Sequence, residues 1–416
     1  MKVVIPAGGK GTRISSITDE IPKAMITING IPILEYQLLL ARRYGYTDFL
    51  FMIGFLGNKI KEYFGDGSRW GVTIDYFQEN KPLGTAGAFA SIKEKINDNF
   101  WVFYGDTVMD FDMGKMLSFH KMQHADATLF LHPNDHPYDS DLVDIDNESQ
   151  IREFYPKPRE NGYYRNLVNA ALYIFSPVIL NYIEENKKSD FGKNIFPLAL
   201  KNGAKLFGYV SAEYIKDMGT PDRYHKVCDD VIKGKVARLN SRNKRPAIFL
   251  DRDGVINKEV NLLSSAEQME LIPSVAKAIK MINQSDYLAV VITNQPVIAR
   301  NLCDFNDLTD IHNKMETLLG NEGAYLDAIY FCPHHPDKGY PEERAEYKIE
   351  CECRKPKPGM ILKAAKDWNI DLHNSYMIGD KITDVKTGEA ANLKQSIKII
   401  TNKENELLSI ISNILK

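Results

Sequence analysis

The sequence lacks the features that would indicate a disulfide-stapled or membrane-spanning protein. It has five cysteines in 416 residues, a small and odd number that does not suit a disulfide framework. No apolar run is long enough to suggest a membrane span. The first strand-like segment meets glycines too early for a signal-peptide apolar region. We therefore expect a cytoplasmic protein with no targeting segment.

An excess of charge of either sign is also absent. The formal net charge is -3, with 44% apolar and 26% charged residues, which is ordinary for a globular protein. Such a balance gives no reason to expect a nucleic acid or a membrane as partner. We expect small-molecule substrates, and the sequence leaves open whether the chain forms a homo-oligomer.

Strand-like apolar runs alternate with helix-like segments throughout the chain. This alternation predicts an α/β fold of two domains, each a mainly parallel sheet flanked by helices. One hydrophobic core rarely extends beyond about 250–300 residues, so two domains are expected. The predicted strands are Val3–Ile5, Phe49–Ile53, Phe100–Tyr104, Ala247–Leu250, Leu288–Ile292 and Tyr376–Ile378.

The boundary between the domains is predicted in a basic and polar segment. Residues 234–245 contain few large apolar side chains and end where a new strand begins. We expect domains at 1–233 and 246–416 with a solvated linker between them. A phosphate-binding arm is the alternative reading of this segment.

A glycine-rich loop follows the first strand. Gly8, Gly9 and Gly11 would let backbone N–H groups approach a polyphosphate, and Arg13 adds a charged fork. A Walker loop fits badly, because Gly11 is followed by Thr-Arg instead of Lys-Ser or Lys-Thr. The dinucleotide-binding fingerprint also fits badly, since it requires glycine or alanine at the position of Ile14. For the glycines alone, a structural turn is an equal alternative.

Further motifs follow this loop in a fixed order. Lys23 comes after a proline, and the small-residue loop Gly84–Gly87 suits close approach by a flat base. Asp106 ends a predicted strand, and Asp217 stands in Asp-Met-Gly-Thr-Pro. Either carboxylate alone could merely cap a turn.

Together these motifs resemble the sugar-1-phosphate nucleotidyltransferase family over about residues 1–230. The resemblance implies Mg²⁺ bound by Asp106 and Asp217, with Arg13 and Lys23 neutralising phosphate charge. It places Lys157 and Asn169 on the sugar-phosphate side, although the acidic residue that many relatives carry before this lysine is a proline here. The residues implied to bind the nucleotide are Ala7, Gly8, Gly9, Gly11, Thr12, Arg13, Lys23, Gly84, Thr85, Gly87 and Asp106.

The second half of the chain opens with two acids after a strand. Asp251 and Asp253 are two residues apart, so both carboxylates can face one loop-lined pocket. Alone, Asp-x-Asp-Gly is also a fragment of metal loops and turns. A strand ending at Thr293, the cations of Arg354-Lys355 and a strand ending at Asp380 follow in order.

These four motifs resemble the haloacid-dehalogenase-type phosphatases. The resemblance implies that Asp251 attacks phosphorus, that Asp253 is the general acid and base, and that Thr293 and Lys355 steady the phosphoryl group. It implies Mg²⁺ held by Asp251, Asp380 and the Asp253 carbonyl oxygen. The expected substrate-binding residues are Asn294, Gln295, Arg354, Lys355 and Lys381.

Three cysteines and a histidine form a separate cluster. Cys332 and His334 make one short ligand pair, and Cys351 and Cys353 make another, which fills a tetrahedral Zn²⁺ shell. His335 is the alternative to His334, and a loose set of polar loop residues is the alternative to a metal site. With no open coordination position, we expect structural zinc.

The zinc loop and the Arg-Lys motif resemble the D-glycero-D-manno-heptose 1,7-bisphosphate 7-phosphatases and the related histidinol-phosphate phosphatases. A phosphatase that makes heptose 1-phosphate would supply a nucleotidyltransferase that consumes one. The resemblance therefore implies a bifunctional enzyme that uses GTP, with GDP-D-glycero-α-D-manno-heptose as product. The alternatives are a pair of enzymes acting on another sugar phosphate, or one half that only binds.

Overall fold

The computed structural model describes residues 1–9, 20–337, 339 and 342–416. The chain divides into two compact units, in which unit 1 comprises residues 1–131, 143–156 and 169–240, and unit 2 comprises residues 132–142, 157–168 and 241–416. The segment expected as a linker includes helix α7 (Lys235–Arg238), which belongs to unit 1. In the described ranges, no helix combines the length and the apolar character needed to span a membrane.

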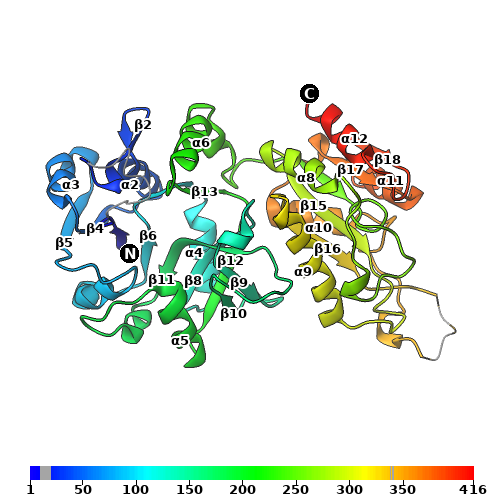
Figure 1. Ribbon diagram of the computed structural model, residues 1–416, viewed down its shortest axis with the longest axis horizontal. Helices are drawn as coiled ribbons and strands as arrows, with labels where there is room; N and C mark the ends of the chain where they lie inside the picture. Colours follow the sequence, from blue (N-terminus) through cyan, green and yellow to red (C-terminus); the bar gives the residue numbers. More distant parts are fainter. Residues whose placement is uncertain (10–19, 338, 340–341) are drawn as a thin grey trace. The chain divides into compact units, whose positions relative to one another are not determined.

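Unit 1 is built on a nine-stranded mixed sheet with the order β10-β9-β11-β6-β1-β4-β5, in which β8 joins β11 to β12 (Figure 1). β1 runs parallel to β4 and β6, whereas β11 runs antiparallel to β6. The central strands are almost wholly buried, as expected for apolar strands covered on both faces. The strands are β1 (Val3–Pro6), β4 (Asp48–Ile53), β5 (Thr73–Gln78), β6 (Phe100–Phe103), β8 (Ala127–His132), β9 (Leu142–Ile145), β10 (Ile151–Tyr155), β11 (Val168–Phe175) and β12 (Leu206–Val210).

Two small strand pairs and six α-helices complete the described part of unit 1. Helix α2 begins at Ile33, after the hairpin of β2 and β3. Helix α4 begins after Asp112, whose carboxylate accepts from the N–H groups of Gly114 and Lys115. The elements are β2 (Thr27–Ile28), β3 (Ile31–Pro32), β7 (Thr107–Asp110), β13 (Tyr214–Asp217), α2 (Ile33–Arg43), α3 (Gly57–Phe64), α4 (Met113–Met122), α5 (Phe196–Lys201), α6 (Pro221–Ile232) and α7.

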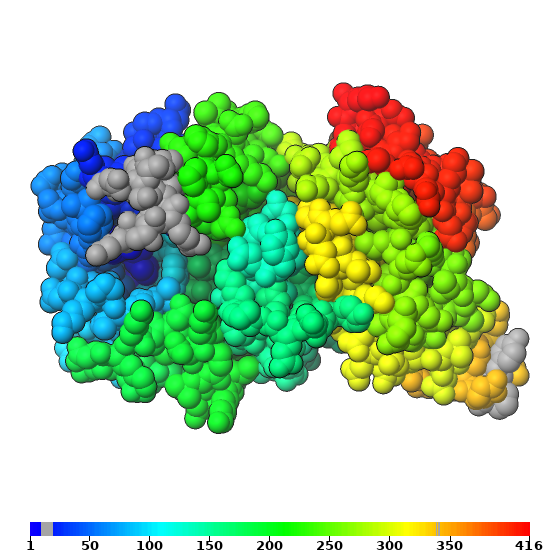
Figure 2. Space-filling model, in the orientation of Figure 1, coloured from blue at the N-terminus to red at the C-terminus, as the bar shows by residue number. Residues whose placement is uncertain are grey.

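Unit 2 contains a five-stranded sheet, all parallel, in the order β16-β15-β14-β17-β18. Helix α8 packs on β15, α10 on β16, and α11 on β17 and β18 (Figure 1). The last helix, α12, buries Leu407 and Ile411 and leaves its other face at the surface of unit 2 (red in Figure 2). The elements are β14 (Ala247–Leu250), β15 (Leu288–Asn294), β16 (Ala328–Cys332), β17 (Tyr376–Gly379), β18 (Gln395–Lys398), α8 (Val275–Gln284), α9 (Phe305–Asn321), α10 (Gly359–Trp368), α11 (Ile382–Ala390) and α12 (Glu406–Ile414).

Two segments from the first half of the sequence are part of unit 2. The backbone N–H of Tyr164 donates to Thr317 Oγ1 at 2.9 Å, and that of Asn166 donates to Glu316 Oε2 at 2.8 Å. Both acceptors lie on α9. From the sequence, residues 132–142 and 157–168 were expected in the first domain. Their hydrogen bonds to α9 join groups far apart in the chain, and such contacts leave no pattern in the local sequence.

The α/β prediction is confirmed, and all six predicted strands are present. β14 has the predicted bounds, and β1, β4, β6, β15 and β17 differ from them by at most two residues at either end. In a parallel sheet, ligands bind beyond the carboxyl ends of the strands. The loops that follow these strands therefore hold the functional side chains described next.

Candidate active sites

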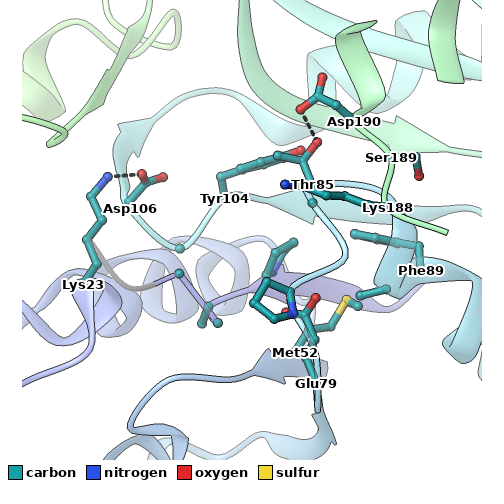
Figure 3. A pocket seen from close by; sticks show the side chains of 18 of the residues that line it. Lys23, Met52, Glu79, Thr85, Phe89, Tyr104, Asp106, Lys188, Ser189 and Asp190 are labelled. Atoms are coloured by element: carbon teal, nitrogen blue, oxygen red, sulfur yellow. Dashed lines mark hydrogen bonds and ion pairs between the residues drawn. The ribbon is translucent and has the colours of Figure 1, made fainter. Parts of the chain in front are cut away.

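Unit 1 contains a cavity of about 730 Å³ at the carboxyl ends of β1 and β6. Its lining includes the loop after β1, the loop at residues 82–88, the turn at Tyr104–Asp106 and the segment 188–194. Figure 3 shows side chains from these segments facing the same space. A cavity of this volume accommodates a ligand the size of a nucleotide.

The described part of the glycine loop approaches its neighbours closely. A Cβ on Gly8 would lie 3.0 Å from Glu79 Oε2 and 3.2 Å from the nitrogen of Gly54. Ala7, Gly8 and Gly9 line the cavity. Gly11, Thr12 and Arg13, also expected in this loop, lie outside the described residues.

The second small-residue loop needs its glycines for packing. Gly84 has a φ of +81°, and a Cβ there would lie 2.3 Å from the carbonyl oxygen of Ser189. A Cβ on Gly87 would lie 2.4 Å from the carbonyl oxygen of Lys187. The Thr85 hydroxyl donates to Asp190 Oδ2 at 2.6 Å. Thr85 thus connects this loop to the segment 188–194, so its hydroxyl has a structural contact in addition to any contact with a ligand.

The segment 188–194, on the other side of the cavity from this loop, was not predicted from the sequence. Lys188, Asp190, Lys193 and Asn194 line the cavity from a segment without a recognised motif. Glu79 was missed as well, although it lies just before the predicted loop and lines the cavity (Figure 3). Its Oε1 accepts from the N–H of Leu83 at 2.8 Å, which fixes the carboxylate beside the loop.

Lys23 and Asp106 line one end of the cavity, and Asp217 lies on the strand beside Asp106. Lys23 Nζ forms an ion pair with Asp106 (dashed in Figure 3). Asp217 lies opposite Thr107 in the β13–β7 ladder, and the N–H of Met218 donates to the carbonyl oxygen of Asp106 at 3.0 Å. The structure therefore brings Asp106, Asp217 and Lys23 together.

The Asp217 carboxylate is held in its charged form. Burial raises its pKa, but the cations outweigh burial and leave the pKa below its ordinary value. Arg223 Nη1 lies 3.0 and 2.8 Å from the two carboxylate oxygens, and Lys23 adds positive charge. A charged carboxylate beside Asp106 is the hard oxygen donor that Mg²⁺ prefers.

Lys157 and Asn169 have other partners. Lys157 Nζ donates to the carbonyl oxygen of Asp139 at 2.6 Å and to its Oδ1 at 3.0 Å. Asn169 Oδ1 accepts from the N–H of Ala171 at 3.2 Å. The described residues that line the cavity include neither Lys157 nor Asn169.

In unit 2, three buried carboxylates lie close together, and two of them contact a lysine. One ligand atom each of Asp251, Asp380 and Asp384 lies within 4.8 Å of the others. Lys355 Nζ lies 2.8 Å from Asp251 Oδ1 and 2.6 Å from Asp384 Oδ1. Burial raises the pKa of Asp251 to about 6, despite the opposing Lys355 charge. Burial lowers the pKa of Lys355, but both acids outweigh it and the net pKa is raised.

Asp380 suits a cation. Its Oδ2 accepts from the Thr401 hydroxyl at 2.8 Å, while its Oδ1 is buried and has no hydrogen-bond donor among the described residues. Gly254 permits this approach, since a Cβ there would lie 2.7 Å from Asp380 Oδ2. A buried carboxylate oxygen among other acids is a suitable ligand for a cation.

Asp253 is held by three side chains. Arg252 and Asn257 donate to Oδ1 at 2.9–3.1 Å, and Gln295 Nε2 donates to Oδ2 at 2.9 Å. Burial raises the pKa of Asp253, but Arg252 and these hydrogen bonds outweigh it, so the pKa lies below its ordinary value. Arg252 and Asn257 were not expected at this site, although Arg252 stands between the two predicted acids.

The polar residues after β15 mainly organise the site. Gln295 Nε2 donates to Thr293 Oγ1 at 2.9 Å as well as to Asp253. Asn294 Oδ1 accepts from the N–H of Lys355 at 3.0 Å, and its Nδ2 donates to the lysine carbonyl at 3.1 Å. Asn294 therefore positions the backbone of the lysine.

A cavity of about 290 Å³ opens beside Asp251 and Asp253. Its cations are Arg354, Lys355 and Lys381. Arg354 Nη1 donates to the carbonyl oxygen of His334 at 2.8 Å, and Lys381 Nζ donates to Glu259 Oε2 at 3.0 Å. An anionic ligand would therefore meet these cations beside the acids Asp251, Asp253 and Glu259.

The sulfur and nitrogen ligands expected for zinc are clustered. One ligand atom from each of Cys332, His334, Cys351 and Cys353 lies within 4.8 Å of the others. The Sγ atoms of Cys332 and Cys353 are 3.1 Å apart, and those of Cys351 and Cys353 are 3.2 Å apart. None of these three cysteines is in a disulfide. His334 Nδ1 belongs to this group, whereas His335 Nδ1 accepts from the N–H of Asp337 at 3.3 Å.

The geometry defines a chain with two centres for phosphoryl chemistry. Each centre has carboxylates at strand ends beside lysine, the arrangement that positions a divalent cation against an anionic phosphate. The class is that of enzymes acting on phosphate compounds.

Comparison with known proteins identifies the families. The nucleotidyl transferase family profile matches residues 2–234, and a HAD-hydrolase-like profile matches residues 352–404. Over 159 residues, the chain is 38% identical to the D-glycero-beta-D-manno-heptose-1,7-bisphosphate 7-phosphatase of Pasteurella multocida, covering 38% of this chain and 84% of that protein. Over 233 residues, it is 32% identical to the mannose-1-phosphate guanylyltransferase of Mycobacterium tuberculosis, covering 56% of this chain and 64% of that protein.

A solved structure from Bacillus anthracis, described as a glucose-1-phosphate thymidylyltransferase, has the fold of the first part. It is 24% identical with a TM-score of 0.50, and the match covers 55% of this chain and 94% of that chain. The chain belongs to the nucleotidyl transferase family in its first part and to the haloacid-dehalogenase-type phosphatases in its second. It is a fusion of two enzymes.

Proposed function

We propose that this protein removes the 7-phosphate of D-glycero-D-manno-heptose 1,7-bisphosphate and joins a nucleotide, GMP from GTP, to the resulting heptose 1-phosphate. The observation that carries the proposal is the fusion itself. One part resembles a phosphatase named for the heptose bisphosphate, and the other belongs to a family that transfers nucleotides. Hydrolysis at C7 leaves a 1-phosphate, which is the kind of group that a sugar nucleotidyltransferase uses.

In unit 1, the proposed reaction requires mainly positioning and charge neutralisation. An oxygen of the sugar 1-phosphate attacks the α-phosphorus in line, and pyrophosphate leaves. We assign Asp106 and Asp217 to hold Mg²⁺, which would neutralise phosphate charge when bound. Lys23 would then be released from Asp106 to face the phosphates, together with Arg13. The loop with Gly84 and Gly87 would face the nucleotide base.

The base is proposed to be guanine for two reasons. The relative that matches the first part at 32% identity is named a guanylyltransferase. In addition, Glu79 lines the cavity beside the base loop, and its Oε1 is fixed by Leu83. A carboxylate is an acceptor only, so it matches the adjacent N1–H and N2–H donors of guanine.

In unit 2, hydrolysis is proposed to proceed in two displacements. Asp251 attacks phosphorus and forms an aspartyl phosphate, while Asp253, after taking up a proton against its lowered pKa, gives that proton to the leaving sugar oxygen. Asp253 then removes a proton from the water that releases phosphate. Lys355 and Thr293 would steady the phosphoryl group, and Arg354 and Lys381 would attract the remaining anionic part of the substrate. Asp384 holds Lys355 in place.

We assign Asp251, Asp380 and the Asp253 carbonyl to Mg²⁺ in this unit. The buried Oδ1 of Asp380, without a donor among the described residues, supports a cation at this position. When bound, Mg²⁺ would draw the anionic nucleophile and the anionic phosphate together.

Structural zinc is proposed for the cluster of Cys332, His334, Cys351 and Cys353. Three sulfurs and one imidazole make a closed tetrahedral set with no position for substrate. Cysteines that serve as metal ligands suit a reducing compartment, and we propose the cytoplasm as the location.

Product identification tests the proposal directly. The full chain would be incubated with Mg²⁺, each of four nucleoside triphosphates and either anomer of the heptose bisphosphate. Both anomers are needed because the phosphatase relative is named for the β-anomer, whereas the family resemblance implies an α-linked product. GDP-heptose with release of phosphate and pyrophosphate is expected. Phosphate release without any nucleotide sugar would exclude the coupled reaction, and mannose 1-phosphate is the hexose control.

A further inference from the structure

Arg252 is a buried cation beside the proposed general acid. Its side chain is 0% exposed. Nε and Nη2 donate to Asp253, and Nη2 also donates to Gln295 Oε1 at 3.0 Å. A guanidinium has five donors and no acceptor, so a buried one needs an acceptor on each side.

His312 of α9 supplies the acceptor on the remaining side. Its Nε2 lies 3.2 Å from Arg252 Nη1. Because Arg252 can only donate, Nε2 must accept, and the imidazole is therefore neutral with its proton on Nδ1. Burial first and Arg252 second lower the pKa of His312 to about 3, in agreement with a neutral ring.

These hydrogen bonds connect His312 through Arg252 to Asp253, the proposed general acid. His312 fixes one edge of the guanidinium, and the guanidinium fixes both oxygens of Asp253. Asn257 and Gln295 complete the set around that carboxylate. Removing the histidine acceptor would leave a buried N–H without a partner, and Arg252 would turn toward another acceptor.

We propose that His312, acting through Arg252, is a positioning residue that aims the Asp253 carboxylate at the leaving-group oxygen. This inference rests on the proposed function, in which Asp253 is the acid and base of the phosphatase. His312 itself touches neither substrate nor metal. Its effect should therefore appear in proton transfer and not in substrate binding.

The experiment compares two phosphate esters on the full chain with Mg²⁺. The heptose bisphosphate has an alcohol leaving group that needs a proton, whereas p-nitrophenyl phosphate releases a phenolate that needs none. For H312F, we expect kcat/KM for the bisphosphate to fall about 10- to 100-fold, because a misplaced catalytic group costs this much. For p-nitrophenyl phosphate, kcat/KM should fall less than about threefold, because it reports only the steps up to the phosphoenzyme.

A conservative variant and a control complete the test. H312Q keeps an oxygen that can accept from Arg252, so it should recover most of the bisphosphate activity. T309A, on an exposed position of the same helix, should behave like the parent protein. If H312F does not fold, as judged by circular dichroism, H312N takes its place, since its shorter amide does not reach the guanidinium.

Three outcomes separate the inference from the function on which it rests. Equal losses on both esters, or no recovery in H312Q, would overturn the positioning role of His312. Retained phosphatase activity in D251N would instead overturn the proposed nucleophile and the function assigned to unit 2. Loss of activity in D251N with a selective, rescued loss in H312F supports both.

Discussion

At the scale of single residues, Glu79 is the side chain on which the choice of base depends. Glu79→Gln keeps the size but replaces one acceptor oxygen by an NH₂ group, which would face the donors of guanine. We expect kcat/KM for GTP to fall about 10- to 100-fold, since an unpaired polar group in a binding site costs about 1–3 kcal/mol. Pyrophosphate release with GTP and with ATP measures the change. An equal loss with both nucleotides would contradict a role in base selection.

Asp327 makes a second prediction at this scale, concerning pH. Burial raises its pKa from 3.8 to about 6, although Arg245 opposes the shift, and its Oδ2 accepts from the N–H of Ala289 at 2.8 Å. Because the folded state holds this proton more tightly than the unfolded state, the carboxyl destabilises the fold as pH rises from about 4 to 6.

Asp327→Asn removes this charge and keeps an acceptor oxygen. We expect the variant to match the parent protein near pH 4 and to exceed its free energy of unfolding by about 1–3 kcal/mol at pH 7. Thermal unfolding of the full chain across this pH range, followed at the transition of unit 2, measures the difference. A constant difference at all pH values would show that Asp327 does not titrate in this window.

At the scale of elements, the strand ends could be predicted from the sequence, whereas the segments that line the cavities around them could not. Buried apolar runs such as Ala247–Leu250 mark their own bounds, and the acids that follow them fall at one edge because the strands are parallel. Glu79, the 188–194 segment and His312 lie outside any motif. Their place depends on packing between distant segments, for which one sequence carries no local signal.

The same distinction separates the motif residues. The resemblance implies that Asn294 and Gln295 bind substrate; both line the smaller cavity, and their amides also contact Lys355, Asp253, Thr293 and Arg252. A motif thus indicates that a residue belongs to a site without saying which neighbour it contacts. Only the three-dimensional arrangement distinguishes a ligand contact from a supporting one.

The zinc loop is the element for which we make a prediction. Cys353 is followed directly by Arg354 and Lys355, and Lys355 contacts Asp251. Cys351→Ser should therefore abolish tight zinc binding, loosen unit 2 and lower phosphatase activity at least about tenfold, while nucleotidyl transfer is nearly unchanged. Metal analysis, thermal melts and both activity assays test this. Full phosphatase stability without zinc would contradict a structural metal.

At the scale of the whole molecule, the two centres use separate sets of side chains. Asp106 and Asp217 belong to unit 1, whereas Asp251 and Asp380 belong to unit 2. Asp251→Asn removes the proposed nucleophile, so phosphate release should fall at least about 1000-fold, while transfer of a nucleotide to supplied heptose 1-phosphate continues. Asp106→Ala removes a proposed Mg²⁺ ligand and should have the reverse effect. The two assays would be run on each folded variant, with heptose 1-phosphate supplied so that the second reaction does not depend on the first. Simultaneous loss of both activities in either variant would contradict independent centres, because neither substitution removes a group from the other unit.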